Sequence, residues 1–193
     1  ALENDILSPN LKINCKGYID FYGEKFHCWK KEGHGVLNLR GAIKRSCDVY
    51  FYEVARKLGV DRLAKTAQSF GLGKKVLKNF QEEKAGVVPN TKWKLNQIGK
   101  NWYIGETLHA GIGQGYFLST PLQLCLMTAQ LANGGYKIYP KIVSKESDET
   151  LEEVKYQIKK NFFFFKEARD GLIEASEQLL SFIKKKKHTP LYK

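Results

Sequence analysis

The sequence predicts an α+β chain in which helices outweigh strands. Three observations support this prediction: apolar residues recur at helical spacing in several segments, capping residues precede those segments, and only two short segments resemble strands. The chain has 193 residues, 42% of them hydrophobic and 27% charged, which suits one folded domain. Collagen-like and wholly disordered proteins are thereby excluded. The longest aromatic run, 162–165, is far shorter than the ~20 apolar residues of a membrane helix.

The first expected helices lie in residues 1–70. Residues 1–7 have the character of a helix end, because Ser8-Pro9-Asn10 stops the pattern. Asn38 is a candidate cap for a helix that reaches about residue 45. A second helix is expected from 49 to Gly59, since glycine readily adopts the left-handed conformation that closes helices. Asp61 is expected to cap a third helix that ends at residue 70.

The later part of the chain mixes connections, strands and a helix. Residues 74–101 show little periodicity and are expected to form an extended surface connection. A strand is expected at 107–115, and a second at 136–143. Between them, Thr120 followed by Pro121 predicts a helix to residue 133, because proline is tolerated in the first helical turn. Cys125 is expected on the apolar face of this helix.

Residues 11–35 have no regular apolar stripe and need another organiser. Cysteine and histidine offer one, since 12, 5 and 12 residues separate Cys15, Cys28, His34 and Cys47. Three thiolates and one imidazole are among the ligand sets of closed structural zinc sites. The spacing lacks a tight C-x-x-C pair, so two alternatives stay open. They are a Cys15–Cys28 disulfide in an oxidising compartment, and thiols that are buried separately.

The chain carries 32 basic and 20 acidic residues, a formal net charge of +12. Such a surplus suggests a nucleic-acid or other anionic partner. Isolated lysine pairs such as Lys30-Lys31 and Lys74-Lys75, however, are typical of solvated faces. We therefore expect no nucleic-acid partner. A Cys3His zinc-dependent module that binds nucleic acid or a cell-wall partner without catalysis remains the alternative function.

Several motifs in residues 1–143 occur in an order and spacing that resemble a known family. They are Cys28-Trp-Lys-Lys-Glu-Gly-His-Gly, Ser46-Cys-Asp-Val-Tyr-Phe-Tyr, Phe70-Gly-Leu-Gly, Val88-Pro-Asn-Thr-Lys-Trp-Lys, Gly111-Ile-Gly-Gln-Gly-Tyr and Thr120-Pro-Leu-Gln-Leu. Together they resemble the transpeptidase domain of the penicillin-binding protein 2 family. These are class B peptidoglycan D,D-transpeptidases of Gram-negative bacteria that act in cell elongation.

The resemblance implies a β-lactamase/transpeptidase-like (penicillin-binding) fold, of which this chain should hold mainly the helical lobe and few sheet strands. It implies acyl transfer, in which a serine attacks a peptidoglycan stem peptide and β-lactams trap that serine. Stem peptide, β-lactams and elongation-machinery membrane proteins are the implied partners. The implied location is the periplasmic face of the bacterial inner membrane, although the sequence shows no signal or transmembrane segment.

Ser46-Cys47-Asp48 matches the S-x-D motif of that family. The resemblance makes Ser46 the proton-relay hydroxyl and Asp48 the polar residue that orients the cleft. The alternative is that Ser46 merely caps the helix that follows. The S-x-x-K motif of the family would lie upstream of residue 1, Ser181-Phe-Ile-Lys184 fits it by letters alone, and no Lys-Thr-Gly occurs. We therefore expect no catalysis by this chain alone.

The resemblance also favours zinc. Some members of the family bind zinc beside the active site, and Cys28, His34 and Cys47 match three of their ligand positions. Cys15 stands near the fourth, where the family often has Asp. The implied ion is structural and would fix Ser46 through its neighbour Cys47.

Residues 144–193 differ in kind from residues 1–143. They contain a Glu-rich stretch, four Phe, a helix-like run and four Lys, and we treat them as a separate helix-rich tail of uncertain origin. Phe and Lys runs are what A- and T-rich codons encode, so frame-shifted coding sequence is one hypothesis for this tail. A non-catalytic protein that keeps the helical half of the fold to bind a cell-wall or morphogenetic partner is a further alternative.

Overall fold

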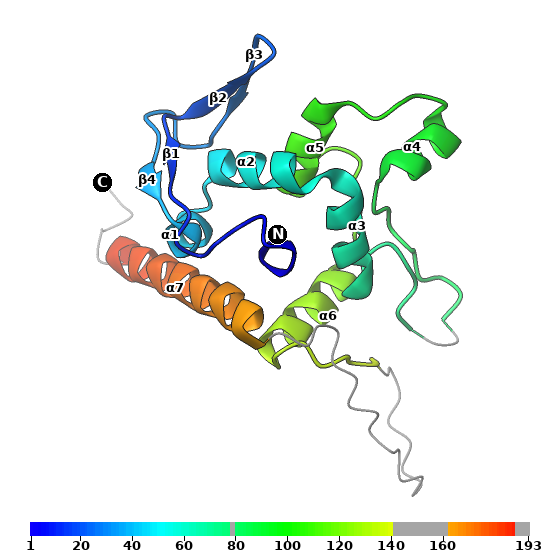
Figure 1. The fold of residues 1–193 in the computed structure, drawn as a ribbon. Helices are drawn as coiled ribbons and strands as arrows, with labels where there is room; N and C mark the ends of the chain where they lie inside the picture. Colours follow the sequence, from blue (N-terminus) through cyan, green and yellow to red (C-terminus); the bar gives the residue numbers. More distant parts are fainter. Residues whose placement is uncertain (78–79, 141–161, 188–193) are drawn as a thin grey trace, which may run out of the picture.

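Helices dominate the fold, and the strands are few and short, as expected for this α+β chain (Figure 1). The computed structural model describes residues 1–77, 80–140 and 162–187. No helix among these residues is long and apolar enough to cross a membrane. In chain order the elements are η1 (Leu2–Asn4), β1 (Ile13–Cys15), β2 (Tyr18–Phe21), β3 (Glu24–His27), β4 (Gly35–Leu37), α1 (Leu39–Lys44), α2 (Asp48–Leu58), α3 (Val60–Ser69), α4 (Thr91–Ile98), α5 (Ile104–Gly111), α6 (Pro121–Ala132) and α7 (Phe162–Lys187).

Three helices match their sequence-based predictions closely. Helix α1 begins after Asn38, whose side chain accepts a hydrogen bond from the Gly41 amide. Helix α2 ends at Gly59, and α6 begins with Thr120 and Gln123 capping each other's backbone amides. In each case a capping side chain or a glycine at the helix end lies within a few residues of the groups it contacts, so the helix boundary can be predicted from the sequence.

Residues 11–37 contain four strands that the sequence pattern did not predict. Strands β1 and β4 pair antiparallel with Ile13 opposite Leu37, and β2 and β3 form a hairpin with Tyr18 opposite His27. Each strand has only three or four residues, which is too short for an alternating pattern to stand out. The hairpin projects from the body of the molecule in Figure 1.

Two predictions in the middle of the chain were wrong. The expected strand at 107–115 is helix α5 followed by a turn, because Glu106 accepts the Tyr103 amide at the helix start and Thr107, Leu108 and Ala110 are buried at helical spacing. The expected connection at 74–101 contains α4, which the Asn90 side chain caps by accepting the Trp93 amide.

Smaller corrections concern helix ends and single residues. Residues 1–7 hold only the 3₁₀ turn η1, and Gly59 closes α2 with φ 80° and ψ 151°, outside the left-handed helical region. Asp61 lies inside α3 and accepts hydrogen bonds from the Thr91 amide and hydroxyl, so it supports the start of α4. Cys125 is exposed rather than in the core. Of the strand expected at 136–143, Tyr136 forms a β-bridge, 137–140 have no strand assignment, and 141–143 lie outside the described residues.

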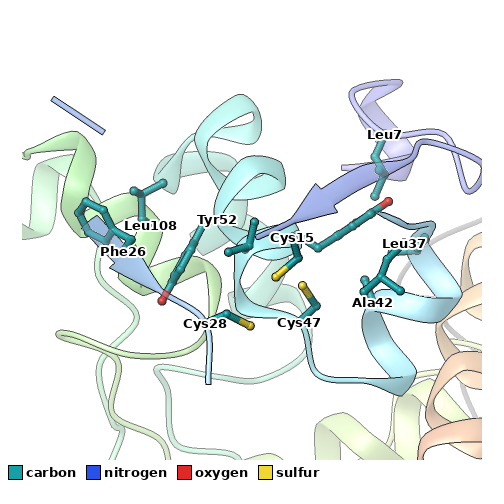
Figure 2. Packing of buried hydrophobic residues seen from close by; sticks show 12 residues of the cluster. Leu7, Cys15, Phe26, Cys28, Leu37, Ala42, Cys47, Tyr52 and Leu108 are labelled. Atoms are coloured by element: carbon teal, nitrogen blue, oxygen red, sulfur yellow. The ribbon is translucent and has the colours of Figure 1, made fainter. Parts of the chain in front are cut away.

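The main core gathers around α2 and includes side chains from the strands and from α5 (Figure 2). Tyr50 and Leu108 are fully buried, and the Phe26 ring of β3 packs edge-on against Tyr52. Helices α2 and α5 approach closely because Gly111 has no side chain. A Cβ at Gly111 would lie 2.4 Å from the Ala55 Cβ. The core therefore joins the strand region to the helices in one unit.

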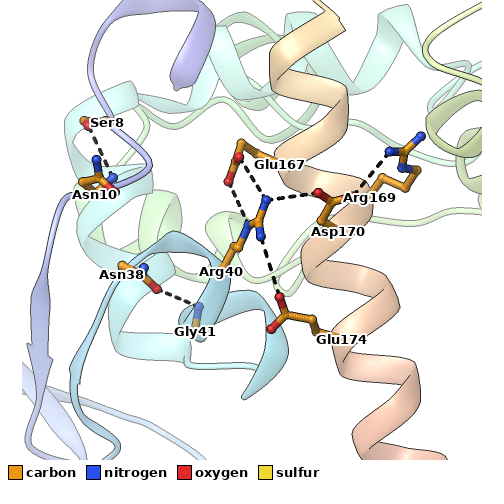
Figure 3. A network of polar contacts seen from close by, with 9 residues as sticks. All are labelled: Ser8, Asn10, Asn38, Arg40, Gly41, Glu167, Arg169, Asp170 and Glu174. Carbon is orange, nitrogen blue, oxygen red and sulfur yellow. Dashed lines mark hydrogen bonds and ion pairs between the residues drawn. The ribbon is translucent and has the colours of Figure 1, made fainter.

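Helix α7, from the expected tail, packs against α1 (Figure 3). Arg40 contacts Glu167 at 3.1 Å and Asp170 at 3.0 Å, and Lys44 lies 3.6 Å from Glu174. The division of the chain at residue 143 stays a prediction, but this part of the segment beyond it is docked on the helix that leads to Ser46.

Candidate metal centre and active-site loop

The four predicted ligands come together in one buried cluster. Cys15 ends β1, Cys28 follows β3, His34 precedes β4, and Cys47 lies between α1 and α2. Their ligand atoms all lie within 4.8 Å of one another. Figure 2 shows the sulfur atoms of Cys15, Cys28 and Cys47 turned toward a common point. Residues separated by up to 32 positions in sequence are thus brought to one place.

The two distances from His34 match those expected around a tetrahedral ion of zinc size. The Nδ1 atom of His34 lies 3.7 Å from the Cys15 sulfur and 3.5 Å from the Cys28 sulfur. With the usual Zn–S and Zn–N bond lengths, tetrahedral ligands lie about 3.6 Å apart for S···N and about 3.8 Å for S···S. All four cysteines are free, so the alternative Cys15–Cys28 disulfide is not formed in this structure. The thiols are buried together, which also departs from the alternative of separate burial.

Two glycines let the cluster close. The backbone near Cys15 crosses the backbone near Lys31 at a distance that admits no side chain. A Cβ on Gly17 would lie 2.0 Å from the Lys31 carbonyl oxygen, and one on Gly33 would lie 2.1 Å from the Cys15 carbonyl oxygen. Both glycines also have positive φ, which L-residues rarely adopt. Across this crossing the Cys28 amide donates to the Gly17 carbonyl at 2.8 Å.

The surroundings of the cluster favour the ligand forms of His34 and Cys15 but not that of Cys47. Burial and the nearby charges of Lys30 and Arg45 lower the pKa of His34, which keeps its imidazole neutral. Burial opposes ionisation of Cys15, but backbone amides of Gly17 and His34 outweigh it and lower the pKa of this thiol. Burial raises the pKa of the Cys47 thiol to about 12. A metal must therefore displace protons from the cluster when it binds.

The predicted catalytic residues, Ser46 and Asp48, flank the candidate ligand Cys47. Ser46 is exposed and has φ 49°, a conformation that a non-glycine residue holds only when its surroundings impose it. The alternative role of Ser46 as a helix cap fails, because the cap position of α2 is Cys47 and carries no side-chain cap bond. Asp48 begins α2, and its carboxylate accepts the Trp29 amide at 2.9 Å.

Trp29 holds this loop from the other side, a role that sequence reasoning missed. Its indole Nε1 donates to the Ser46 carbonyl at 2.8 Å and lies 3.2 Å from the Arg45 carbonyl. Its ring packs edge-on against His34 with centroids 5.3 Å apart. Because Trp29 follows the candidate ligand Cys28, the Cys3His cluster and the Ser46 loop share the same support. The only sequence signal was its position next to a candidate ligand.

Other candidate residues lie apart from this site. His27 is exposed and packs against the Tyr18 ring, so it is no ligand. The Lys65-Thr66-Ala67 segment lies in α3. Ser181 and Lys184 lie on α7, and their side chains are outside the described ones. His188 also lies outside the described residues.

A second polar feature, also missed, is buried near α5. Lys94 of α4 is only 2% exposed, and its ammonium contacts both carboxylate oxygens of Glu106, one at 2.7 Å. The rings of Trp102, Tyr103 and Tyr116 surround the same ammonium, the nearest centroid being 4.5 Å away. A lysine inside a weakly periodic segment gives no sequence sign of such burial.

Solved structures of similar shape define the class of fold. Penicillin-binding protein 2 of Pseudomonas aeruginosa, solved in complex with WCK 5153, has a TM-score of 0.82 and 35% identity, with 89% of this chain and 38% of that chain covered. The complex between penicillin-binding protein 2 and MreC from Helicobacter pylori has a TM-score of 0.76 and 35% identity, with 90% and 32% covered. The expected penicillin-binding fold is confirmed.

The model of the penicillin binding protein transpeptidase domain matches residues 1–170, and the chain belongs to that family. The match continues beyond residue 143, where the resemblance based on motifs stopped. Peptidoglycan D,D-transpeptidase MrdA of Acinetobacter baumannii is 41% identical over 133 residues, which cover 68% of this chain and 20% of that protein. The MrdA protein of Haemophilus influenzae is 37% identical over 154 residues, covering 79% and 24%. The chain thus spans roughly a fifth to a quarter of the length of these relatives.

Proposed function

We propose that this chain supplies the second-serine loop of a peptidoglycan D,D-transpeptidase of the penicillin-binding protein 2 type, which cross-links the cell wall during elongation. The observation that carries the proposal is the exposed, positive-φ Ser46, supported on one side by Trp29 and on the other by the buried Cys47. A serine whose backbone is fixed in this way suits proton relay between a nucleophile's base and the leaving amine. Asp48 supports the loop through the Trp29 amide.

The nucleophile must come from elsewhere. The family's S-x-x-K motif does not occur in this chain apart from Ser181-Phe-Ile-Lys184, and Lys-Thr-Gly does not occur. We expect the isolated chain to be inactive. The comparisons favour a transpeptidase over the independent Cys3His module, since the family match spans residues 1–170.

The cluster of Cys15, Cys28, His34 and Cys47 is proposed to hold a structural Zn²⁺. The donor set and its spacing fit the ion, and with four protein ligands no position is open for substrate. When bound, the ion supplies a cross-link and no chemistry of its own. Its effect on the reaction would pass through Cys47, the middle residue of the motif, which lies between Ser46 and Asp48.

Location and partners follow from the relatives. The curated MrdA proteins come from Gram-negative bacteria, and we propose the periplasmic face of the inner membrane for the protein that contains this chain. The Helicobacter pylori complex with MreC supports an elongation-machinery partner. Stem peptide is the proposed substrate and β-lactams the proposed inhibitors.

Labelled penicillin tests the catalytic part of the proposal. The isolated chain should take up no covalent label, whereas a full-length relative treated in parallel should be labelled. A Ser181→Ala variant serves as control, because label that disappears with this substitution would make Ser181 a nucleophile and contradict the proposal. Restoring the missing motifs by fusion to the corresponding segments of a relative should restore labelling, and Ser46→Ala should then reduce it.

Elemental analysis tests the metal part. We expect about one zinc per chain and a loss of bound zinc in Cys28→Ser. The matched control is Cys125→Ser, because Cys125 is exposed on α6 and lies outside the cluster. Equal zinc in Cys28→Ser and the unaltered chain would contradict the site.

A further inference from the structure

A pocket of 210 Å³ lies where α5 meets the segment that follows it. Its walls include Trp102, Glu106, His109, Gln114 and Tyr116. Pockets that bury a drug-sized ligand measure roughly 300–1,000 Å³, so this one suits a single small ring. The pocket belongs neither to the metal cluster nor to the Ser46 loop.

The pocket carries no free charge. The carboxylate of Glu106 is already paired with the Lys94 ammonium, and it also accepts the Tyr103 amide at 2.8 Å and the Tyr116 hydroxyl at 3.3 Å. A charged ligand would find no unpaired opposite charge here, and it would lose its hydration on entry. The arrangement therefore favours a neutral ligand.

The aromatic walls are fixed before any ligand binds. The Trp102 indole donates to the Thr107 hydroxyl at 2.8 Å, and the Trp102 and Tyr116 rings lie 6.3 Å apart at 59°. The Trp93 ring also packs against Tyr116, with centroids 5.4 Å apart. Rings held from several sides offer a rigid apolar face, which lowers the entropy cost of binding a flat ligand.

Two polar side chains at the pocket are unused. Among the described residues, the side chains of His109 and Gln114 have no hydrogen-bond partner. The Gln114 amide nitrogen of the backbone donates to the His109 carbonyl at 2.9 Å, and this turn places both residues at the same pocket. An amide and an imidazole can each both donate and accept, as hydroxyl and acetamido groups require.

We propose that this pocket binds one N-acetylhexosamine ring of a glycan strand. A pyranose ring presents an apolar C–H face to aromatic rings, and its hydroxyl and acetamido groups are neutral and hydrogen-bonding. These properties match the fixed rings, the paired charge and the two unused polar groups. The inference rests on the proposed function, since a peptidoglycan transpeptidase meets stem peptides that are attached to such strands.

Titration of the full 193-residue chain with N-acetylglucosamine trimer tests the inference, with binding followed by tryptophan fluorescence and by saturation-transfer NMR. We expect the trimer to bind and Gln114→Ala to weaken binding at least fivefold, since one hydrogen bond is lost. The matched control is Gln97→Ala, an exposed glutamine on α4 that does not line the pocket. It should leave the affinity unchanged, and maltotriose, which lacks acetamido groups, should bind more weakly than the trimer.

Failure to bind the trimer at millimolar concentrations, or equal affinity of Gln114→Ala and the unaltered chain, would overturn the inference. So would binding of a sugar-free stem peptide that is lost with Gln114→Ala. Zinc content and far-UV circular dichroism of each variant show that the chain is folded. Because the trimer has no peptide, a negative result leaves the penicillin and zinc tests of the proposed function unaffected.

Discussion

The strand region (residues 11–48) and the helical region (residues 89–132) reach order by different means. In the helical region, capped helices bury apolar residues at regular spacing, and one buried ion pair adds to the packing. In the strand region, strands of three or four residues converge on four ligand side chains, and two glycines permit the backbone crossing. A segment without periodicity can thus be well ordered when a few side chains meet at one point.

Metal removal should separate the two regions most sharply. Stripping the proposed zinc with a chelator should disorder the strands of residues 11–37 while the helices keep their far-UV signal, because buried ligands that lose their ion are left without a cross-link. We expect the thermal midpoint to fall by about 10 °C, which corresponds to roughly 3–4 kcal/mol for a chain of this size. Hydrogen exchange resolved by region checks this expectation. An equal loss of hydrogen-exchange protection in the strand and helical regions would contradict this prediction.

Breaking the Lys94–Glu106 pair tests the helical region. Lys94→Met leaves a partly buried carboxylate unpaired, and the free energy of unfolding should fall by about 3 kcal/mol. Zinc content should not change. The double variant Lys94→Met/Glu106→Gln should recover part of the loss in a denaturant titration, because no charge is then left alone. A double variant as unstable as the sum of the two single variants would show that the pair is not coupled.

The contact between α5 and α2 offers a smaller test. Gly111→Ala places a methyl group 2.4 Å from the Ala55 Cβ, and such overpacking should cost about 1–3 kcal/mol. Gly105→Ala on the same helix is the control, because its nearest contact is the end of the Phe26 ring at 3.3 Å. Urea midpoints of the two variants measure the difference. Equal midpoints would mean that the helices can separate at little cost.

The smallest expected effect concerns α7. Arg40→Ala removes ion pairs to Glu167 and Asp170, but these groups are partly solvated and salt screens them. The thermal midpoint should fall only slightly at low salt and not at all at high salt. Arg56→Ala, which loses a pair within α2 alone, is the control. A large fall in the thermal midpoint that is the same at low and high salt would contradict this expectation and show that the Arg40 contacts between α1 and α7 contribute strongly to stability.

The sequence predicted those parts of the fold whose signals are local. Helix starts could be predicted at Asn38 and at Thr120-Pro121, because these residues cap or begin the helix within its first turn. The strand predicted at 107–115 was wrong because a short apolar run such as Thr107-Leu108 can occur in either a strand or a helix. The contact of Gly111 with α2, which favours the helix, involves residues far apart in the sequence. Asp61 failed as a cap because its partner, Thr91, lies 30 residues away.

The candidate site was predictable in part. Motif, spacing and the family resemblance predicted Ser46, Asp48 and four candidate metal ligands, and the structure brings the four candidate ligands together. Trp29 and the Lys94–Glu106 pair were missed, because their roles depend on which backbone groups and rings lie near them. Residue type alone does not predict that Trp29 donates to the Ser46 carbonyl, or that Lys94 is buried beside Glu106.

The placement of Cys47 has a consequence for how the loop is made. A metal that joins Cys15 to Cys47 closes a ring of chain 33 residues long, and the entropy of that closure is lost only once the ion binds. Ser46 is the sequence neighbour of the closing residue, so the proposed ion would restrict its backbone as well. If the site holds zinc, metal supply would decide what share of these chains has the Ser46 loop in this conformation.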